Sequence, residues 1–264
     1  MLCSVCDSAT VLFGEATVLA RHKAVFVRCP KCGTLAIENP HWLHEAYSQA
    51  ITVSDLGLVA RNLDLSRIVR VLIRLFFNPA GRFLDCAGGY GLLVRLMRDA
   101  GFDFYWHDPY CTNLFASQFS QSTAGDGPFE LVTAFEMLEH LESPVQEFDR
   151  MFSLSENILC TTLLLPEPAP KPQEWWYYGL EHGQHITFYT RRSLELIAER
   201  FGRRFYTNGS GMHLFSTQQH SQLLFGFLAR HKVARLLAPW LGRPSLLQAD
   251  FTRATGLTLD RRNV

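Results

Sequence analysis

A chain of 264 residues, 47% of them hydrophobic, can bury a full core and suits one sizeable domain with a small accessory module. Its 25 basic and 25 acidic side chains balance, so no net positive field attracts it to nucleic acid or to an anionic membrane. The first residues lack a basic stretch followed by a sustained apolar one, and no other stretch is apolar enough to span a bilayer, which predicts a cytoplasmic location.

Four of the seven cysteines form two Cys-x-x-Cys pairs, Cys3 with Cys6 and Cys29 with Cys32. Two thiolates spaced i, i+3 on a tight turn can face one tetrahedral ion, and two such turns complete a four-thiolate zinc site. Four unligated thiols are the alternative, and it leaves the spacing unexplained. We predict a zinc ribbon over residues 1–39, with a structural zinc because four protein ligands leave no open coordination position.

A helical segment is expected to follow the ribbon. Through residues 54–77 the apolar side chains of Leu65, Ile68 and Leu72 recur at steps of three and four residues, which is typical of an amphipathic helix. The asparagine, proline and glycine within residues 78–81 end this helix.

From residue 82 onward the predicted strands and helices alternate. Strands are expected over 82–86, 104–107, 129–135 and 157–164, and helices over 92–100 and 136–152. This alternation is typical of a parallel sheet that helices cover on both faces. A proline-rich connector and an aromatic stretch follow; a helix over 191–201 with Thr190 as its N-cap then precedes two strands near Phe205 and Leu214.

The stretch from Asp85 to Gly91, DCAGGYG, joins a predicted strand to a predicted helix. Such a glycine turn exposes backbone N–H groups and lets a ligand approach closely at the carboxyl edge of the sheet. The acid before the glycines suits a cationic group rather than a pyrophosphate. Asp108 stands at the end of the next predicted strand, where a carboxylate can accept both hydroxyls of a ribose. The pattern predicts a nucleotide site.

These residues resemble the class I S-adenosylmethionine-dependent methyltransferases. The first motif of that family is an acid followed by x-G-x-G-x-G; Asp85, Gly89 and Gly91 match it, whereas Ala87 replaces the first glycine. The resemblance continues through FELVTAFEMLEHLESP, which is similar to the small-molecule branch, and through EHGQHITFYTRRSLELIAERFG. It implies an α/β fold with a Rossmann-like, doubly wound and mostly parallel sheet, here joined to the small N-terminal zinc ribbon, and S-adenosylmethionine as the cofactor.

The resemblance also assigns roles in cofactor binding. The residues it implies are Asp85, Gly89, Gly91, Asp108, Phe135 and Glu136. By this resemblance the first aspartate lies near the methionine part of the cofactor, the glycines border the nucleoside and the second aspartate holds the ribose. The last two residues flank the methyl group that is transferred.

Methyl transfer is an in-line displacement at a sulfonium carbon, so the protein must align the acceptor and take a proton from a hydroxyl or acidic carbon. The candidate catalytic residues are His140, Glu181, His182 and His185. On the predicted helix, Glu136, Glu139 and His140 share one face, where they can orient the imidazole, bind a divalent ion or bond only to one another. Aromatic residues at 175–178 precede the other histidines and suit a sugar ring or a quinone-like ring as acceptor.

The predicted organisation has four parts: a zinc ribbon at 1–39, a helical linker at 40–79, a Rossmann-like methyltransferase domain at 80–220 and a helical extension at 221–264. The apolar run near the start of the extension carries Arg230, Lys232 and Arg235, which make it too charged to span a membrane. Packing on the core or on an oligomeric partner is favoured over binding at a lipid surface.

The sequence predicts a methyltransferase that acts on a small molecule, such as a sugar or glycan hydroxyl or carbon. Two other interpretations stay open: an RNA methyltransferase whose zinc ribbon recognises the substrate, and a non-catalytic zinc-ribbon adaptor. The neutral charge argues against nucleic acid as a partner. The acid-and-glycine motif with Asp108 argues against the adaptor.

Overall fold

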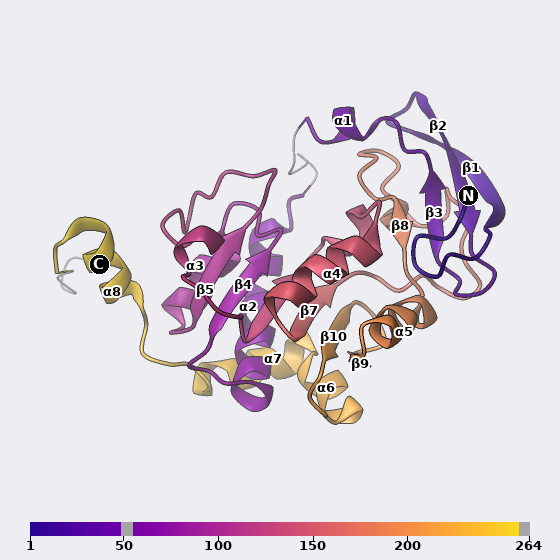
Figure 1. Cartoon of the computed structure of the whole chain (residues 1–264). Helices are drawn as coiled ribbons and strands as arrows, with labels where there is room; N and C mark the ends of the chain where they lie inside the picture. Colours follow the sequence, from indigo (N-terminus) through magenta and orange to yellow (C-terminus); the bar gives the residue numbers. More distant parts are fainter. Residues whose placement is uncertain (49–54, 259–264) are drawn as a thin grey trace. The chain divides into compact units, whose positions relative to one another are not determined.

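The computed structural model of the chain describes residues 1–48 and 55–258 (Figure 1). The chain divides into two compact units, each built from two stretches of sequence. Met1–Asp55 and Ala134–Gln222 form the first, which we name the cysteine unit. Leu56–Thr133 and Leu223–Val264 form the second, which we name the glycine-turn unit.

Six strands form a sheet in the order β5-β4-β6-β7-β10-β9. Their bounds are β4 Arg82–Cys86, β5 Asp103–His107, β6 Leu131–Ala134, β7 Asn157–Thr161, β9 Arg204–Thr207 and β10 Met212–Ser216. β4 and β5 run parallel, with Asp85 opposite Trp106, whereas β10 runs antiparallel to both of its neighbours. A mixed α/β fold with a mostly parallel sheet was predicted and is confirmed, and it is consistent with a Rossmann-like methyltransferase fold.

A second sheet of four antiparallel strands lies within the cysteine unit, in the order β1-β2-β3-β8. The strands are β1 Val11–Val18, β2 His22–Arg28, β3 Leu35–Glu38 and β8 Thr187–Phe188. β8 comes from the stretch after the proline-rich connector, and its Phe188 pairs with Leu35. The N-terminal sheet is therefore completed by a segment far away in the sequence.

The aromatic stretch before β8 is mostly core. Tyr177 and Tyr178 are buried with Phe26 and Phe188, and only Trp176 is strongly exposed, at 75%. The rings of Tyr177 and Tyr178 fill the core of the small N-terminal sheet, and the ring of Tyr177 also lies 4.8 Å from that of His185.

The helices of the cysteine unit are short, with at most 11 residues each. They are α1 Leu43–Ala46, η2 Leu138–His140, α4 Pro144–Leu154, η3 Trp176–Tyr178 and α5 Arg191–Arg200. The predicted helix over 136–152 is wrong at its start, because a proline disfavours helical backbone in the residue before it, and Ser143 has a φ of −125° and a ψ of 69°. Thr190 caps α5 as predicted, and its hydroxyl accepts a hydrogen bond from the Ser193 N–H.

The glycine-turn unit contains the longest helix of the described residues, α2, and several shorter ones. They are α2 Leu58–Phe76, α3 Leu92–Asp99, η1 Gln121–Thr123, α6 Gln222–Leu228, α7 His231–Leu237, η4 Ala238–Trp240 and α8 Leu247–Thr255, of which α6 begins one residue before this unit. Ile68 and Leu72 bury the predicted apolar face of α2, which packs against α3 and α7. The start predicted at residue 54 lies outside the described residues.

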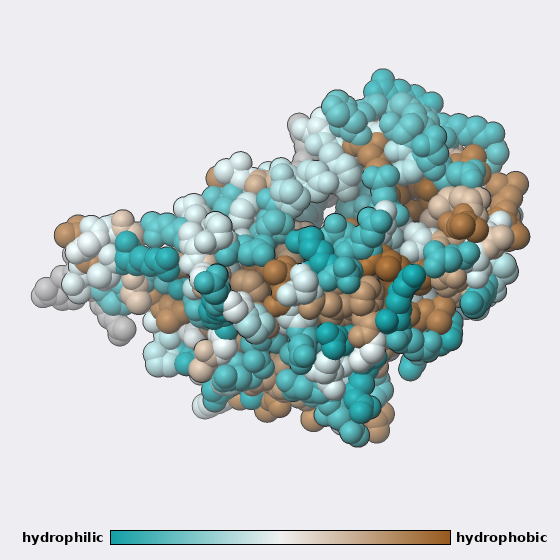
Figure 2. All heavy atoms as spheres, viewed as in Figure 1, coloured by the Kyte–Doolittle hydropathy of each residue, from teal (hydrophilic) through white to brown (hydrophobic). Residues whose placement is uncertain are grey.

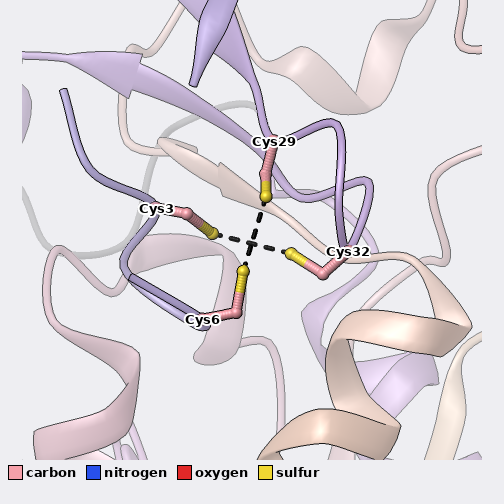
Figure 3. Close-up of side chains that lie close together, drawn as sticks. All are labelled: Cys3, Cys6, Cys29 and Cys32. Atoms are coloured by element: carbon pink, nitrogen blue, oxygen red, sulfur yellow. Dashed lines mark hydrogen bonds between the residues drawn. The ribbon is translucent and has the colours of Figure 1, made fainter. Parts of the chain in front are cut away.

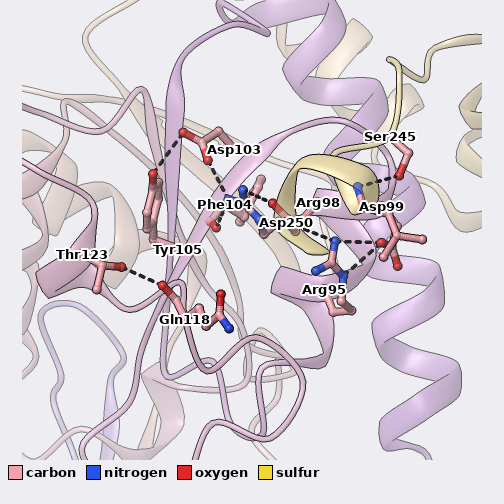
Figure 4. Close-up of polar contacts among 11 residues, drawn as sticks. Arg95, Arg98, Asp99, Asp103, Phe104, Tyr105, Gln118, Thr123, Ser245 and Asp250 are labelled. Atoms are coloured by element: carbon pink, nitrogen blue, oxygen red, sulfur yellow. Dashed lines mark hydrogen bonds and ion pairs between the residues drawn. The ribbon is translucent and has the colours of Figure 1, made fainter. Parts of the chain in front are cut away.

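A buried ion-pair network attaches α8 to this unit (Figure 4). The Arg98 guanidinium donates to both carboxylate oxygens of Asp250, at 2.9 and 2.7 Å, and Arg95 adds a third bond at 2.9 Å. Arg98 also donates to Asp103 on β5 at 2.6 Å. Because Arg98 and Asp250 are both buried, this network links the C-terminal segment to the sheet.

The surface is mainly hydrophilic, and apolar side chains reach it in several places (Figure 2). Among them are Leu223, Phe227, Leu236 and Trp240 on α6, α7 and η4. Within the described residues, no helix is both long enough and apolar enough to cross a membrane.

Candidate functional site

The two Cys-x-x-Cys pairs come together in the cysteine unit, and their four sulfur atoms point toward a common centre (Figure 3). The Sγ atoms of Cys3 and Cys32 are 3.6 Å apart, and those of Cys6 and Cys29 are 3.5 Å apart. Zinc–sulfur bonds of about 2.3 Å in a tetrahedron require sulfurs separated by about 3.8 Å. The hydrogen bond between the Cys3 and Cys32 thiols lowers the pKa of Cys3 and raises that of Cys32. The four thiols therefore fit a tetrahedral ion.

The two cysteine turns have matching backbone. The N–H of Asp7 donates to the Cys3 carbonyl at 3.0 Å, and the N–H of Gly33 donates to the Cys29 carbonyl at 2.9 Å. Asp7 and Gly33 both have a positive φ, at 58° and 77°. A side chain at Gly33 would lie 2.8 Å from the methyl group of Thr190, so the second turn also needs glycine for space.

The glycine turn follows β4 in the other unit. Asp85, at the end of β4, is buried, and its carboxylate accepts a 2.6 Å hydrogen bond from the Thr133 hydroxyl on β6. Burial, with a smaller contribution from the charge of Asp108, raises the pKa of Asp85 to about 7, although the hydrogen bond from Thr133 opposes the shift. The carboxyl group therefore changes its charge near neutral pH, where a bound cation would favour the ionised form.

Three residues of the turn have left-handed backbone. The φ angles of Ala87, Gly89 and Gly91 are 57°, 52° and 83°. Gly91 begins α3, and a side chain there would collide with the Asn113 amide. Ala87 occupies a conformation that costs an L-residue about 1 kcal/mol, which makes it the strained member of the turn.

Asp108 lies against the same turn. One of its carboxylate oxygens accepts the Gly89 N–H at 2.9 Å, and the other accepts the N–H groups of Tyr110 and Cys111 at 2.8 and 3.0 Å. The indole of Trp106 donates to the Gly89 carbonyl at 2.9 Å. The structure thus brings together four of the predicted cofactor residues, with Asp108 and Gly89 in direct contact.

Phe135 and Glu136, the other two predicted cofactor residues, belong to the cysteine unit. Phe135 is buried, and Glu136 is exposed with a φ of 51°. The Thr161 hydroxyl accepts from the Glu136 N–H at 2.8 Å and donates to its carboxylate at 2.7 Å. These two bonds hold a strained residue two positions after the end of β6, as is typical of functional sites.

Three imidazoles gather in the cysteine unit, and we name them the histidine cluster: His140, His182 and His185. The ring of His185 lies 4.9 Å from that of His140 and 4.7 Å from that of His182, edge to face in both cases. The Tyr47 hydroxyl bonds to Nδ1 of His140 at 2.9 Å. Glu181, the fourth predicted catalytic residue, is exposed.

Burial makes all three imidazoles weak bases. It lowers the pKa of His185 to about 4 and that of His182 below its ordinary value. It also lowers the pKa of His140 far below the usual range, helped by His185 and His182. The cluster is therefore neutral at neutral pH, and its nitrogens can accept a proton or ligate a metal.

Glu139 lies beside the histidine cluster and is fully buried. Burial raises its pKa to about 8, and the charge of Glu136 acts in the same direction. Glu139 was expected to share a helix face with Glu136 and His140. That grouping is wrong, because η2 replaces the predicted helix and Glu136 bonds to Thr161. Glu139 instead groups with His140 and His185.

Three residues that contact the site were not predicted from the sequence. Thr133 could have been noticed, since it is a polar residue inside an otherwise apolar strand. Nothing in the sequence points to Trp106 or Tyr47, because the contact of the indole with the turn and that of the tyrosine with His140 depend on the tertiary structure alone.

A family model described as "Methyltransferase domain" matches residues 60–206. No curated protein is significantly similar to the chain. Among solved structures, an O-methyltransferase family 2 protein from Planctomyces limnophilus in complex with apigenin is 14% identical with a TM-score of 0.42, and the match covers 66% of each chain. Human N-acetylserotonin methyltransferase with SAM is 17% identical, with a TM-score of 0.43 and coverage of 68% of this chain and 66% of that one. Magnesium protoporphyrin IX methyltransferase from Synechocystis with bound SAH is 11% identical, with a TM-score of 0.39 and coverage of 68% of this chain and 96% of that one.

Proposed function

The chain belongs to the methyltransferase-domain family and is a methyltransferase; from this premise we propose that it transfers the methyl group of S-adenosylmethionine to a small molecule, such as a sugar or glycan hydroxyl or carbon. The observation that carries the proposal is the assembly of Asp85, Gly89, Gly91 and Asp108 around one turn at the carboxyl edge of the sheet. S-adenosylmethionine, when bound, supplies an electrophilic methyl group on a sulfonium.

The proposed cofactor contacts follow from charge and from free hydrogen-bonding capacity. The cationic methionine part would lie beside Asp85, a buried acid whose pKa is raised by burial and by the charge of Asp108, so that a cation would stabilise its ionised form. A carboxylate has about four lone-pair sites, and three of those on Asp108 accept backbone N–H groups. A ribose hydroxyl would take the fourth site, which the Cys111 thiol also approaches.

Phe135 and Glu136 are proposed to flank the transferred methyl group. They follow Thr133, the hydrogen-bond partner of Asp85, by two and three residues. Successive Cα atoms are about 3.8 Å apart, so the backbone alone keeps the Cα of Phe135 within about 8 Å of the Cα of Thr133.

The histidine cluster is proposed to bind the acceptor and to receive its proton. In this step the acceptor atom attacks the methyl carbon, the carbon–sulfur bond breaks toward sulfur, and the acceptor proton moves to a neutral imidazole. Trp176 is the exposed aromatic of the preceding stretch and is free to contact a ring of the acceptor. Burial lowers the pKa of His182, and the charge of Glu181 partly opposes this shift.

The four cysteines are proposed to hold a structural zinc. Their spacing fits tetrahedral thiolate ligation, and the set Cys3, Cys6, Cys29 and Cys32 leaves no position for a substrate. The zinc would stabilise the N-terminal sheet without taking part in methyl transfer.

Calorimetric titration with S-adenosylhomocysteine tests the cofactor site. Wild-type protein is expected to bind, and Asp108→Ala to bind at least about tenfold more weakly, because it loses both the ribose acceptor and the bond to Gly89. Asp99→Ala is the matched control, since Asp99 is an exposed acid on α3 in the same unit. Absence of binding by the wild type would overturn the proposal; with binding present, sugars, quinones and RNA can be screened as acceptors.

A further inference from the structure

Three ligand-type side chains converge beside the histidine cluster. Glu139, His140 and His185 each place one ligand atom so that all three atoms lie within 4.8 Å of one another. Glu139 and His140 come from η2, whereas His185 comes from the loop before β8, more than 40 residues later in the sequence. One carboxylate and two imidazoles are a common ligand set for divalent transition metals.

The Glu139 carboxylate lacks the partners that a buried acid needs. Neither of its oxygens accepts a hydrogen bond from any described residue. The hydroxyls of Tyr177 and Thr162 lie near enough to lower the pKa of Glu139, which burial raises, but they do not reach hydrogen-bond geometry with it and bond to each other at 3.2 Å. A buried, unpaired carboxylate is costly, and a metal cation would compensate it.

The two imidazoles are held as metal ligands usually are. Nδ1 of His185 must donate its hydrogen, because its 2.6 Å partner is the Tyr177 carbonyl, and the lone pair then lies on Nε2. The Tyr47 hydroxyl holds the His140 ring through Nδ1. Such outer contacts orient ligating histidines in metal sites.

His182 is the member of the cluster that does not fit the ligand set. Its Nδ1 accepts the Gln184 N–H at 3.1 Å, and its ring packs against Gly179, where any side chain would collide with it. This difference between neighbouring imidazoles provides a control.

We propose that Glu139, His140 and His185 bind a divalent transition-metal ion of the kind that accepts nitrogen and oxygen ligands, such as zinc. Three protein ligands leave coordination positions open, unlike the four-cysteine site. If the proposed function holds, an oxygen of the acceptor would take an open position, and coordination would lower the pKa of its hydroxyl. With the metal bound, the hydroxyl proton would pass to solvent in place of a ligating imidazole, and the oxygen lone pair would attack the methyl carbon. Metal binding itself does not depend on that function.

Cobalt titration of the full-length protein tests the site. One equivalent of Zn²⁺ is added first and fills the four-thiolate site, which binds zinc more tightly than two imidazoles and one carboxylate do. Added Co²⁺ then occupies the second site, where it gives visible absorption without a thiolate charge-transfer band. We expect saturable binding of about one Co²⁺ per chain. His185→Ala and Glu139→Gln should each weaken it by at least about tenfold, since loss of an outer partner alone typically costs about 10- to 100-fold.

Two variants serve as controls. His182→Ala removes a neighbouring imidazole outside the ligand set, and Glu142→Gln removes an exposed acid three residues after Glu139; both should retain Co²⁺ binding. Circular dichroism identifies any variant that fails to fold, and Glu139→Gln, which preserves side-chain volume, then decides between the outcomes. No saturable absorption in the wild type, or equal binding in folded Glu139→Gln, would overturn the metal site. S-adenosylhomocysteine binding on the same preparation reports the methyltransferase function separately, because its proposed main contacts lie in the glycine-turn unit.

Discussion

The glycine turn and the histidine cluster are held together in different ways. The turn is fixed by backbone: the N–H groups of Gly89, Tyr110 and Cys111 bind Asp108, and left-handed residues shape the chain. The cluster is fixed by side chains whose segments meet only in the folded unit, as in the contact of Tyr47 with His140. A backbone-built site is suited to a cofactor of constant structure, whereas a side-chain-built site can change its acceptor by substitution.

The largest expected effect concerns the cysteine unit, whose small sheet depends on the proposed zinc. Cys32→Ser should lower the zinc content by about one ion per chain and unfold the N-terminal sheet, because structural zinc in small domains binds with about 10–16 kcal/mol. Elemental analysis and hydrogen exchange measure both effects. Cys111→Ser, in the other unit, should retain zinc, and retention of zinc by Cys32→Ser would refute the assignment.

The stability of the glycine-turn unit is expected to depend on the buried ion pair between Arg98 and Asp250. Asp250→Ala leaves the buried Arg98 without its bidentate partner and is expected to lower the free energy of unfolding by about 3–5 kcal/mol. Denaturant unfolding measures this loss. The exposed control Asp99→Ala should cost about 0.5 kcal/mol, and similar costs for the two variants would show that the buried network does not stabilise the unit.

Stability and ligand binding at the proposed cofactor site are expected to depend on pH, because Asp85 changes its charge near neutral pH. Its folded-state pKa of about 7 lies above the ordinary 3.8, so between these values the folded protein binds more protons than the unfolded chain. Its contribution to stability is therefore present at low pH and is lost as the pH rises through about 7. A cation binds the ionised form better, so affinity for S-adenosylhomocysteine should rise by up to about tenfold per pH unit below pH 7 and level off above it.

Calorimetry across this pH range checks the prediction. Asp85→Asn, which keeps the side-chain size and cannot ionise, should bind more weakly and with little pH dependence. An unchanged pH profile in that variant would show that another group controls binding.

The smallest expected effect is at Ala87, the strained residue of the turn. Ala87→Gly should relieve the left-handed backbone and raise the free energy of unfolding by about 1 kcal/mol or less, because glycine also gains freedom in the unfolded chain. Ala100→Gly is the control, since Ala100 has a φ of −85° and gains nothing. Stabilisation by both substitutions would mean that backbone strain is not the cause.

Much of the fold could be predicted because its signals are local. The alternating strands and helices, the cap at Thr190 and the acid before the glycines each depend on neighbouring residues. The helix expected over 136–152 was wrong because its helical periodicity was given more weight than the proline at 144. The burial of the two tyrosines in the aromatic stretch was not predicted, because composition does not distinguish a buried tyrosine from one that contacts a ligand.

By itself, the sequence determined the cysteine pairs, the acid-and-glycine turn and the α/β fold class, since each follows from short-range spacing and backbone preference. Only the tertiary structure decided that β8 completes the N-terminal sheet and that Glu139, rather than Glu136, joins His140 and His185. The physical reason is that burial and side-chain packing act between segments far apart in the chain. Which carboxylate is left without partners depends on where those segments meet.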